Sequence, residues 1–161
     1  MRPILVHLIL AAAGALTFSA CGDDAGSTAP PQMSDSQIVY SFIGPSVAPQ
    51  YHDEYTLTIA DGQGTLRRGT YGVVDGTTEP ASTRTEPVDE ATWDQLANRL
   101  NTLPDTEGEA GCAGGSTFGV TVTTGSRTVH RSSGYACGSG FDQVADPYLA
   151  FIAPVSERFG L

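Results

Sequence analysis

The sequence predicts an α+β domain in which an antiparallel sheet of about five strands carries two helices on one face. Two observations support this prediction. Segments 55–60 and 118–123 alternate apolar and polar side chains with the period of a half-buried strand. Segments 89–103 and 141–155 repeat apolar residues at the spacing of an amphipathic helix.

The first half of the domain is predicted to hold three strands. Residues 37–43 form the first and residues 55–60 the second, and both are rich in β-branched and aromatic side chains. The third spans 65–74, with a bulge expected at Gly69, where the alternation slips. Residues 75–87 are polar and rich in turn-forming residues, so they are predicted to form an exposed loop.

The second half is predicted to consist of a helix, a hairpin and a second helix. Asp89 is the expected N-cap of the first helix, and Pro104 ends it. Residues 118–131 read as two strands joined by a glycine turn. The last helix is expected to start at Pro147 with Asp146 as its cap.

The two hairpin segments share a pattern. Residues 55–68 and 118–131 each place three alternating apolar residues before a glycine and an arginine at the end. A predicted helix follows each segment, so the domain could consist of two ββα halves that share one sheet. The alternative is chance similarity, because most β-hairpins show this pattern.

The first twenty residues have the features of a secretory signal peptide: a positive start, an apolar run and small residues at the end. The stretch Phe18-Ser19-Ala20-Cys21 resembles the lipobox of bacterial lipoproteins. Phe18 departs from the leucine usual in that class. The alternatives are a plain signal peptide with a chance cysteine, or an uncleaved anchor helix, for which the apolar run is short.

The resemblance covers residues 1–21 and implies how the protein is held at the cell envelope. In this class Cys21 is lipidated on sulfur and becomes the mature N-terminus, facing the periplasm or the exterior. Several acyl chains, palmitate among them, give a stable membrane anchor. By the sorting rule of the class, Gly22 after the cysteine implies the outer membrane in a cell that has one.

Three segments follow from this organisation. Residues 1–20 are the lipoprotein signal peptide, residues 21–37 are the lipidated cysteine and a flexible tether, and residues 38–161 are a single globular domain. The tether is polar and rich in glycine and proline, so it cannot bury enough surface to offset the entropy lost on ordering.

The chain is strongly acidic, with a net charge of −10 and no lysine. Without a basic cluster it is not expected to bind nucleic acid or anionic lipid head groups. The acidic side chains could steer a basic partner, or could simply form a solvated surface.

The two remaining cysteines, Cys112 and Cys137, flank the second hairpin. In an oxidising compartment they are predicted to form a disulfide, which would stabilise the fold by about 3 kcal/mol. A zinc site is the alternative, but His52 and His130 do not stand at zinc-ligand spacing. We therefore expect no metal and no other cofactor.

Two histidines are candidate site residues. His52 stands beside Asp53 and Glu54 and could act as a base, but neighbours in a strand point to opposite faces, so an exposed polar strand start is favoured. His130 could form a triad with Ser132 and Asp142, but no nucleophile motif surrounds the serine.

Arg84 is the third candidate, because it stands in the predicted loop between Pro80 and Pro87. Many protease inhibitors present one side chain from a rigid loop of this kind; a solvated linker is the alternative.

These observations predict a non-enzymatic binding or interaction module of unknown ligand, with a protein as a candidate partner. The contacts are expected on the open face of the sheet, at Thr56, Thr58, Thr121 and Thr123, or on the loops. The alternatives are an inhibitor of an extracellular hydrolase and a small hydrolase that uses one of the two histidines.

Overall fold

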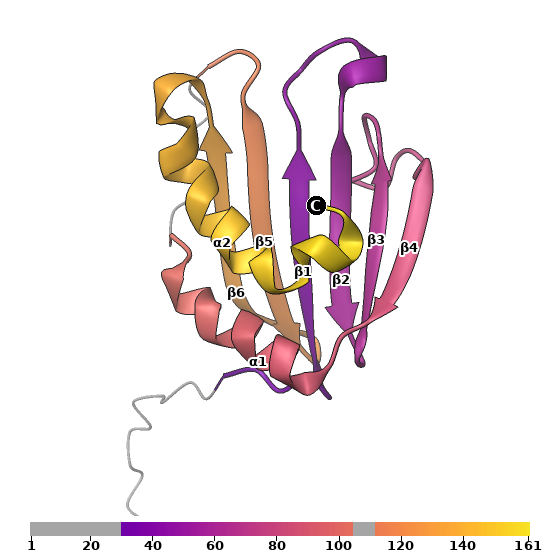
Figure 1. Cartoon of the computed structure of the whole chain (residues 1–161), viewed down its shortest axis with the longest axis vertical. Helices are drawn as coiled ribbons and strands as arrows, with labels where there is room; N and C mark the ends of the chain where they lie inside the picture. The colour runs from indigo at the N-terminus through magenta and orange to yellow at the C-terminus, as the bar shows by residue number, and fades with distance from the viewer. Residues whose placement is uncertain (1–29, 105–111) are drawn as a thin grey trace, which may run out of the picture.

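The computed structural model describes residues 30–104 and 112–161, which form one antiparallel sheet with two helices (Figure 1). The sheet has six strands in the order β4-β3-β2-β1-β5-β6. The strands are β1 (Ser36–Ile43), β2 (Glu54–Ala60), β3 (Gln63–Gly69), β4 (Ser82–Pro87), β5 (Ser116–Thr124) and β6 (Arg127–Ala136). The helices are α1 (Glu90–Arg99) and α2 (Phe141–Phe159).

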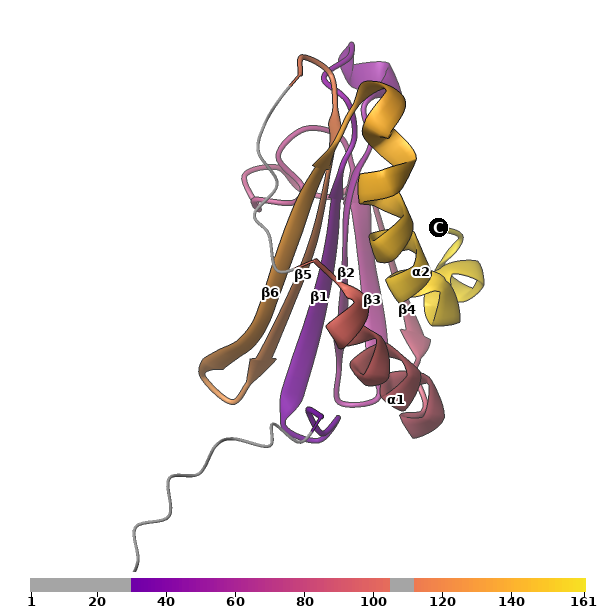
Figure 2. The ribbon, with the colours of Figure 1, turned by 90° about the vertical axis from the view of Figure 1, so that its left-hand side faces the viewer.

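Both helices pack on the same face of the sheet, which confirms the predicted α+β class (Figure 2). The core lies between the two layers. It is built from alternate strand residues and from the inner stripes of the helices, and its fully buried side chains include Ile38, Tyr40, Leu57, Ile59, Trp93, Leu96, Phe118, Val120, Tyr148 and Phe151. The apolar side chains of the alternating strand positions and of the helical stripes thus pack together in one hydrophobic layer.

The prediction of about five strands is wrong, because the sheet has a sixth strand, β4. β4 lies at the edge of the sheet, in the segment for which the sequence predicts a loop, and none of its residues is buried. An edge strand without a buried face has no apolar alternation, so the sequence carries no signal for it. Pro87 is tolerated there because an edge strand can leave one side of its backbone unpaired.

The third strand is shorter than predicted and ends at Gly69 without a bulge. A Cβ atom at Gly69 would lie 2.9 Å from the Val73 side chain and 3.0 Å from the backbone nitrogen of Ala81. The glycine therefore lets the following loop, residues 70–81, turn back closely against the end of the strand.

Helix α1 begins where the sequence predicts. The Asp89 carboxylate accepts a hydrogen bond from the backbone N–H of Thr92 at 2.8 Å, which is the geometry of an N-cap. This bond and the Thr92 hydroxyl lower the pKa of Asp89, because both stabilise the carboxylate. After Arg99 the chain tightens into a 3-10 turn (Leu100–Thr102) that is capped by Leu103, just before Pro104.

Helix α2 begins six residues before Pro147, so the prediction that Asp146 caps it is wrong. Gly140 is the N-cap, and both Pro147 and Pro154 lie inside the helix. Pro147 frees the carbonyl four residues earlier, on Gln143, which is exposed to water. The helix ends at Gly160, whose φ of 72° is the left-handed conformation that glycine readily adopts.

The two predicted ββα halves differ in the number of strands that precede the helix. α1 follows a meander of four strands, whereas α2 follows the single hairpin β5–β6. β1 lies between β2 and β5 and joins the two parts into one sheet.

Candidate functional site

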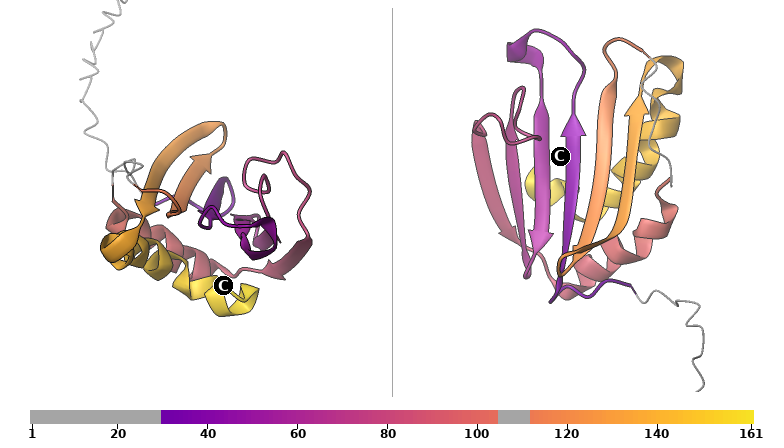
Figure 3. Two further views of the ribbon diagram at one scale, coloured as in Figure 1. Left: turned by 90° about the horizontal axis from the view of Figure 1, so that it is seen from above. Right: turned by 180° about the vertical axis from the view of Figure 1, so that it is seen from behind.

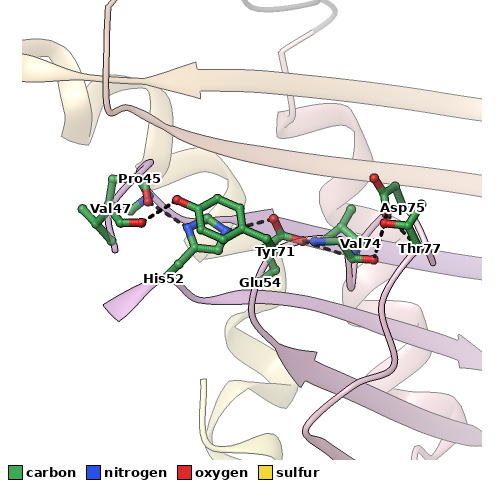
Figure 4. A network of polar contacts seen from close by, with 9 residues as sticks. Pro45, Val47, His52, Glu54, Tyr71, Val74, Asp75 and Thr77 are labelled. Carbon is green, nitrogen blue, oxygen red and sulfur yellow. Dashed lines mark hydrogen bonds and ion pairs between the residues drawn. The ribbon is translucent and has the colours of Figure 1, made fainter. Parts of the chain in front are cut away.

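A buried polar cluster joins two loops at the end of the sheet where β1 ends and β2 begins (Figure 4). His52 follows the short 3-10 helix Pro49–Tyr51, and Glu54 is the first residue of β2. Each is only 5% exposed. His52 Nε2 lies 2.9 Å from Glu54 Oε1, and His52 Nδ1 lies 2.8 Å from the carbonyl oxygen of Pro45.

These two contacts fix the position of one proton of the His52–Glu54 pair and limit the second proton to two arrangements. A carbonyl oxygen can only accept, so His52 Nδ1 carries a proton and donates it to Pro45. The contact between Nε2 and Glu54 then holds one further proton, either on an imidazolium facing a carboxylate or on a carboxylic acid facing a neutral imidazole. In either arrangement both ring nitrogens of His52 are satisfied.

The second oxygen of Glu54 binds the loop between β3 and β4. Glu54 Oε2 accepts hydrogen bonds from the backbone N–H of Gly72 at 3.0 Å and from that of Val74 at 3.2 Å. Gly72 has a φ of +87°, and a Cβ there would lie 2.5 Å from Thr77 Oγ1. A glycine is therefore required for this loop to reach the carboxylate.

Tyr71 closes the cluster from the outside. Its ring stacks on the His52 ring, with the centroids 3.6 Å apart and the planes inclined by 3°. Its hydroxyl donates to the carbonyl oxygen of Val47 at 2.6 Å. We call His52, Glu54 and Tyr71 the loop latch, because they tie the β1–β2 loop (residues 44–53) to the β3–β4 loop (residues 70–81).

The predicted exposure of His52 and Glu54 is wrong. The two residues are separated by two positions and their side chains meet, whereas Asp53 between them pairs with Arg68 through two bonds of 2.7 Å. The β3–β4 loop covers the cluster from the side of the sheet opposite the helices (Figure 2). The His52 side chain is fully buried and that of Glu54 is 7% exposed, so the arrangement positions loops and presents no ring nitrogen to solvent.

Exposed apolar and aromatic side chains surround the loop latch: two lie on the β1–β2 loop, and the third is Tyr71 of the latch itself. Tyr51 is 76% exposed, Val47 is 40% exposed and Tyr71 is 39% exposed. We call these three residues the tip patch. None of the three is among the residues predicted for the site, although two prolines and a tyrosine within residues 44–51 indicate a stiff loop that presents an aromatic side chain.

Arg84 is exposed, as predicted, but it lies in strand β4 and not in a loop. It is paired in register with Leu66 of β3, and its Nε donates to Glu86 Oε1 at 2.8 Å. The inhibitor interpretation of Arg84 requires a protruding loop. Instead, the backbone of Arg84 is paired with β3, and its side chain is bonded to Glu86.

His130 lies in β6, opposite Val122, and lines a cavity of about 580 Å³. The other lining residues are Pro30, Pro31, Ala97, Asn98, Leu100, Asn101, Leu103, Thr124 and Val129. No carboxylate is among them, and His130 Nε2 is buried without a hydrogen-bond partner in the described residues. Among the described residues the two histidines thus differ: His52 contacts a carboxylate and lines none of the cavities, whereas His130 lines a cavity whose lining contains no carboxylate.

The catalytic triad of Ser132, His130 and Asp142 that was considered from the sequence is not formed, because the Ser132 hydroxyl is bonded elsewhere. Ser132 Oγ donates to the carbonyl oxygen of Pro104 at 2.5 Å and is 2.8 Å from the Tyr148 hydroxyl. Ser132 is 3% exposed, so its hydroxyl joins β6 to α2 inside the core. In residues 30–104 and 112–161 no three His, Cys, Asp or Glu side chains are grouped so that they could hold a metal ion.

Cys112 and Cys137 are neighbours at the base of the β5–β6 hairpin, with both thiols free. A hydrogen bond with the Cys112 side chain raises the pKa of the Cys137 thiol. Tyr135 holds the turn before β5 in place, because its hydroxyl donates to the Cys112 carbonyl at 2.6 Å and accepts from the Gly115 N–H at 3.0 Å. Cys21, the predicted lipidation site, lies outside the described residues.

The sequence matches no protein-family model, and no curated protein matches it either. The interpretation of the site therefore depends on the geometry described above.

Proposed function

We propose that this protein is a lipid-anchored module of the cell envelope that binds a partner protein through the tip patch. The observation that carries the proposal is the use of the buried His52–Glu54 pair to hold the loops that expose Tyr51. Tyrosine is enriched among the residues that dominate binding energy in protein interfaces. A loop that is already rigid loses little conformational entropy when a partner binds.

The position of the N-terminal segment supports a model in which the tip patch points away from the membrane. The N-terminal segment is bound to the domain where β1 begins, through a hydrogen bond of 2.8 Å from Trp93 Nε1 to the carbonyl oxygen of Pro31. The β1–β2 loop lies at the opposite end of the sheet (Figures 1 and 2). A strand of the length of β1 spans about 25 Å. An anchor at Cys21 would therefore leave the tip patch on the side of the domain that is farther from the membrane.

The anchor itself is proposed from the lipobox resemblance at Phe18-Ser19-Ala20-Cys21. None of the helices in the described part of the chain is long and apolar enough to cross a membrane. With the palmitate and other acyl chains on Cys21 the domain would face the periplasm or the exterior, and Gly22 favours the outer membrane by the rule of that class.

Replacing Cys21 with serine is expected to move the protein from the membrane fraction to the soluble fraction and to abolish incorporation of labelled palmitate. The reason is that the acyl chains supply the membrane affinity. Cys137→Ser is the matched control, because it removes a cysteine elsewhere in the chain. Membrane association and labelling that persist in Cys21→Ser would refute the anchor.

The partner site can be tested with a photo-crosslinking residue placed at Gln50, beside Tyr51 on the exposed 3-10 helix. On intact cells we expect a discrete adduct, and we expect Tyr51→Ser to weaken it at least about tenfold because a central interface tyrosine is lost. Leu149→Ser, which removes an exposed apolar side chain from α2, should leave the adduct unchanged. An adduct insensitive to Tyr51→Ser, or none at Gln50, would contradict the proposal.

Inhibition of an extracellular hydrolase is the second candidate function. A stiffened loop that exposes one aromatic side chain favours it, and this loop takes the place that the sequence analysis assigned to Arg84. The crosslinking experiment distinguishes the two functions: an inhibitor would capture a hydrolase at Gln50, and the purified protein would lower the activity of that enzyme.

The disulfide between Cys112 and Cys137 also belongs to the proposal. It is supported by the proximity of the two thiols, close enough for Cys112 to raise the pKa of Cys137, and by the oxidising compartment that the signal peptide implies. Its expected effect on stability is large and is treated in the Discussion.

A further inference from the structure

No helix lies on the face of the sheet that points away from α1 and α2, although the β3–β4 loop covers part of this face beside the loop latch (Figure 3). Many strand residues on this face carry hydroxyl groups. We call this face the open face. Because strand side chains alternate, it carries the residues between the buried core positions. Its hydroxyl-bearing residues are Ser41, Thr56, Thr58, Thr65, Thr83, Thr85, Thr117, Thr121, Thr123 and Ser133.

The strand register arranges these residues in rows across the sheet. In one row Thr85 is paired with Thr65, Thr65 with Thr58, and Thr58 with Val39. Val39 is in turn paired with Thr121 of β5. Neighbouring strands lie about 4.8 Å apart, so each row is a line of closely spaced hydrogen-bonding groups perpendicular to the strands.

Two arginines on the open face have no side-chain partner among the described residues. Arg67 lies in β3, in register with Thr56 and Thr83, and Arg131 lies in β6, opposite Thr121. Four other arginines are bonded: Arg68 to Asp53, Arg84 to Glu86, Arg99 to the carbonyl of Ala150 and Arg158 to the carbonyl of Pro87. The open face therefore holds two arginines that no side chain of the described residues pairs.

No carboxylate on the strands opposes these two arginines. The six strands contain only Glu54 and Glu86. Glu54 is buried in the loop latch, with both of its oxygens bonded. Glu86 is paired with Arg84 and stands opposite Gly64, which lies against Phe159 of α2 and so faces the helices. Among the strand residues of the open face, the charged side chains are thus the two arginines, with no free carboxylate beside them.

Apolar side chains are few on the open face: β1 places Val39 and Ile43 there, and neither is an exposed large hydrophobic residue. The exposed large hydrophobic residues of the described chain are Val47, Tyr51, Tyr71, Val129, Phe141 and Leu149, and none of them occupies an open-face strand position that we have named. Hydroxyl rows with sparse positive charge suit a hydrophilic polymer whose own hydroxyls donate and accept hydrogen bonds.

We propose that the open face binds an acidic polysaccharide that lies across the strands and places carboxylates near Arg67 and Arg131. The two arginines are four strand spacings apart, a separation of roughly 20 Å along the row direction. Threonine and serine hydroxyls between them contact the neutral part of the polymer. This second surface is independent of the tip patch and would hold the domain against a glycan layer.

Each arginine contributes modestly, because both guanidinium groups act close to water. We expect Arg67→Gln and Arg131→Gln each to weaken binding roughly fivefold, and the double variant to weaken it about 25-fold if the contacts are independent. Raising the salt concentration to 1 M should remove most of the difference, because the screening length falls to about 3 Å.

The test uses the purified full chain in detergent micelles and three probes: hyaluronan, which carries a carboxylate on every second sugar, uncharged dextran, and polyglutamate. Affinity electrophoresis or calorimetry should show binding to hyaluronan, weaker binding to dextran and weaker binding to polyglutamate. The matched control is Arg127→Gln. Arg127 also lacks a described partner, but it is paired with Thr124, which lines the cavity on the helix side.

The outcomes separate the alternatives. Binding to hyaluronan that falls in the two open-face variants and not in Arg127→Gln supports the proposal. Equal binding to polyglutamate would overturn the glycan assignment in favour of an acidic peptide. An equal loss in Arg127→Gln, or no binding to hyaluronan, would overturn the open face as the site. Because Tyr51→Ser should leave glycan binding unchanged, failure here is distinguishable from failure of the tip patch.

Discussion

Replacing Glu54 with alanine is expected to lower the free energy of unfolding by about 3 kcal/mol, and the melting temperature by roughly 10 °C. The loss arises because one carboxylate satisfies three partners. Without it, His52 Nε2 and the backbone N–H groups of Gly72 and Val74 lose their hydrogen bonds in a buried site. Thermal and urea unfolding followed by circular dichroism measure the effect.

Asp53→Ala is the control for this prediction, because Asp53 is the adjacent residue and also forms an ion pair. Its side chain is 34% exposed and that of Arg68 is 43% exposed. Water and salt screen such a pair, so its removal should cost less than about 1 kcal/mol. Equal losses in Asp53→Ala and Glu54→Ala would show that the burial of Glu54 is not the source of its contribution.

Glu54→Gln should retain most of the stability. The glutamine oxygen can accept from Gly72 and Val74, while its amide group donates to His52 Nε2 and Nδ1 still donates to Pro45. A loss as large as that of Glu54→Ala would show that an ionic charge, and not the geometry of the hydrogen bonds, holds the loop latch together.

The same pair of variants links the loop latch to the proposed partner site. In Glu54→Ala the two loops lose their common ligand, so the Gln50 crosslink should weaken even though Tyr51 is unchanged. In Glu54→Gln it should persist. A crosslink of equal strength in both variants would separate the loop latch from binding and leave it a purely structural feature.

The second large effect is expected from the disulfide. Under oxidising conditions, Cys137→Ser should lower the free energy of unfolding by about 3 kcal/mol, because the bond limits the conformations of the unfolded chain between Cys112 and Cys137. Under reducing conditions the variant and the unmodified protein should unfold alike. Thiol titration of the denatured protein reports whether the bond has formed.

The comparison across redox conditions is what makes this test decisive. A serine at position 137 also replaces a sulfur atom by an oxygen atom, but that change is present in both conditions. A stability difference that appears only in the oxidised samples identifies the covalent bond. Two titratable thiols on Cys112 and Cys137 in protein isolated from the envelope would refute the pairing.

The fold class was predictable because its signals are local. The strands β2 and β5 alternate apolar and polar residues, and α1 has its cap at Asp89 and an apolar stripe through Trp93 and Leu96. A residue pattern of this kind records which side of an element is buried, whatever buries it. The start of α2 was less predictable, because Pro147 resembles a helix start but is also tolerated inside this helix.

The candidate site depends on contacts between segments that are distant in the sequence. Nothing near His52 indicates that the N–H groups of Gly72 and Val74 will bind the carboxylate beside it, or that Tyr71 will stack on its ring. The burial of a polar residue depends on a covering segment, and residues 70–81 have no periodic pattern that would place them there. The sequence could therefore indicate reactive residue types but not their surroundings.

The amino-acid sequence alone therefore determined the α+β class, the two helices and the two hairpins β2–β3 and β5–β6, because these follow from the spacing of apolar residues along the chain. Tertiary structure alone decided that β4 completes the sheet, that His52 and Glu54 are buried, and that Arg67 and Arg131 share the face opposite the helices. The physical reason is that pairing, covering and charge compensation are properties of neighbours in space.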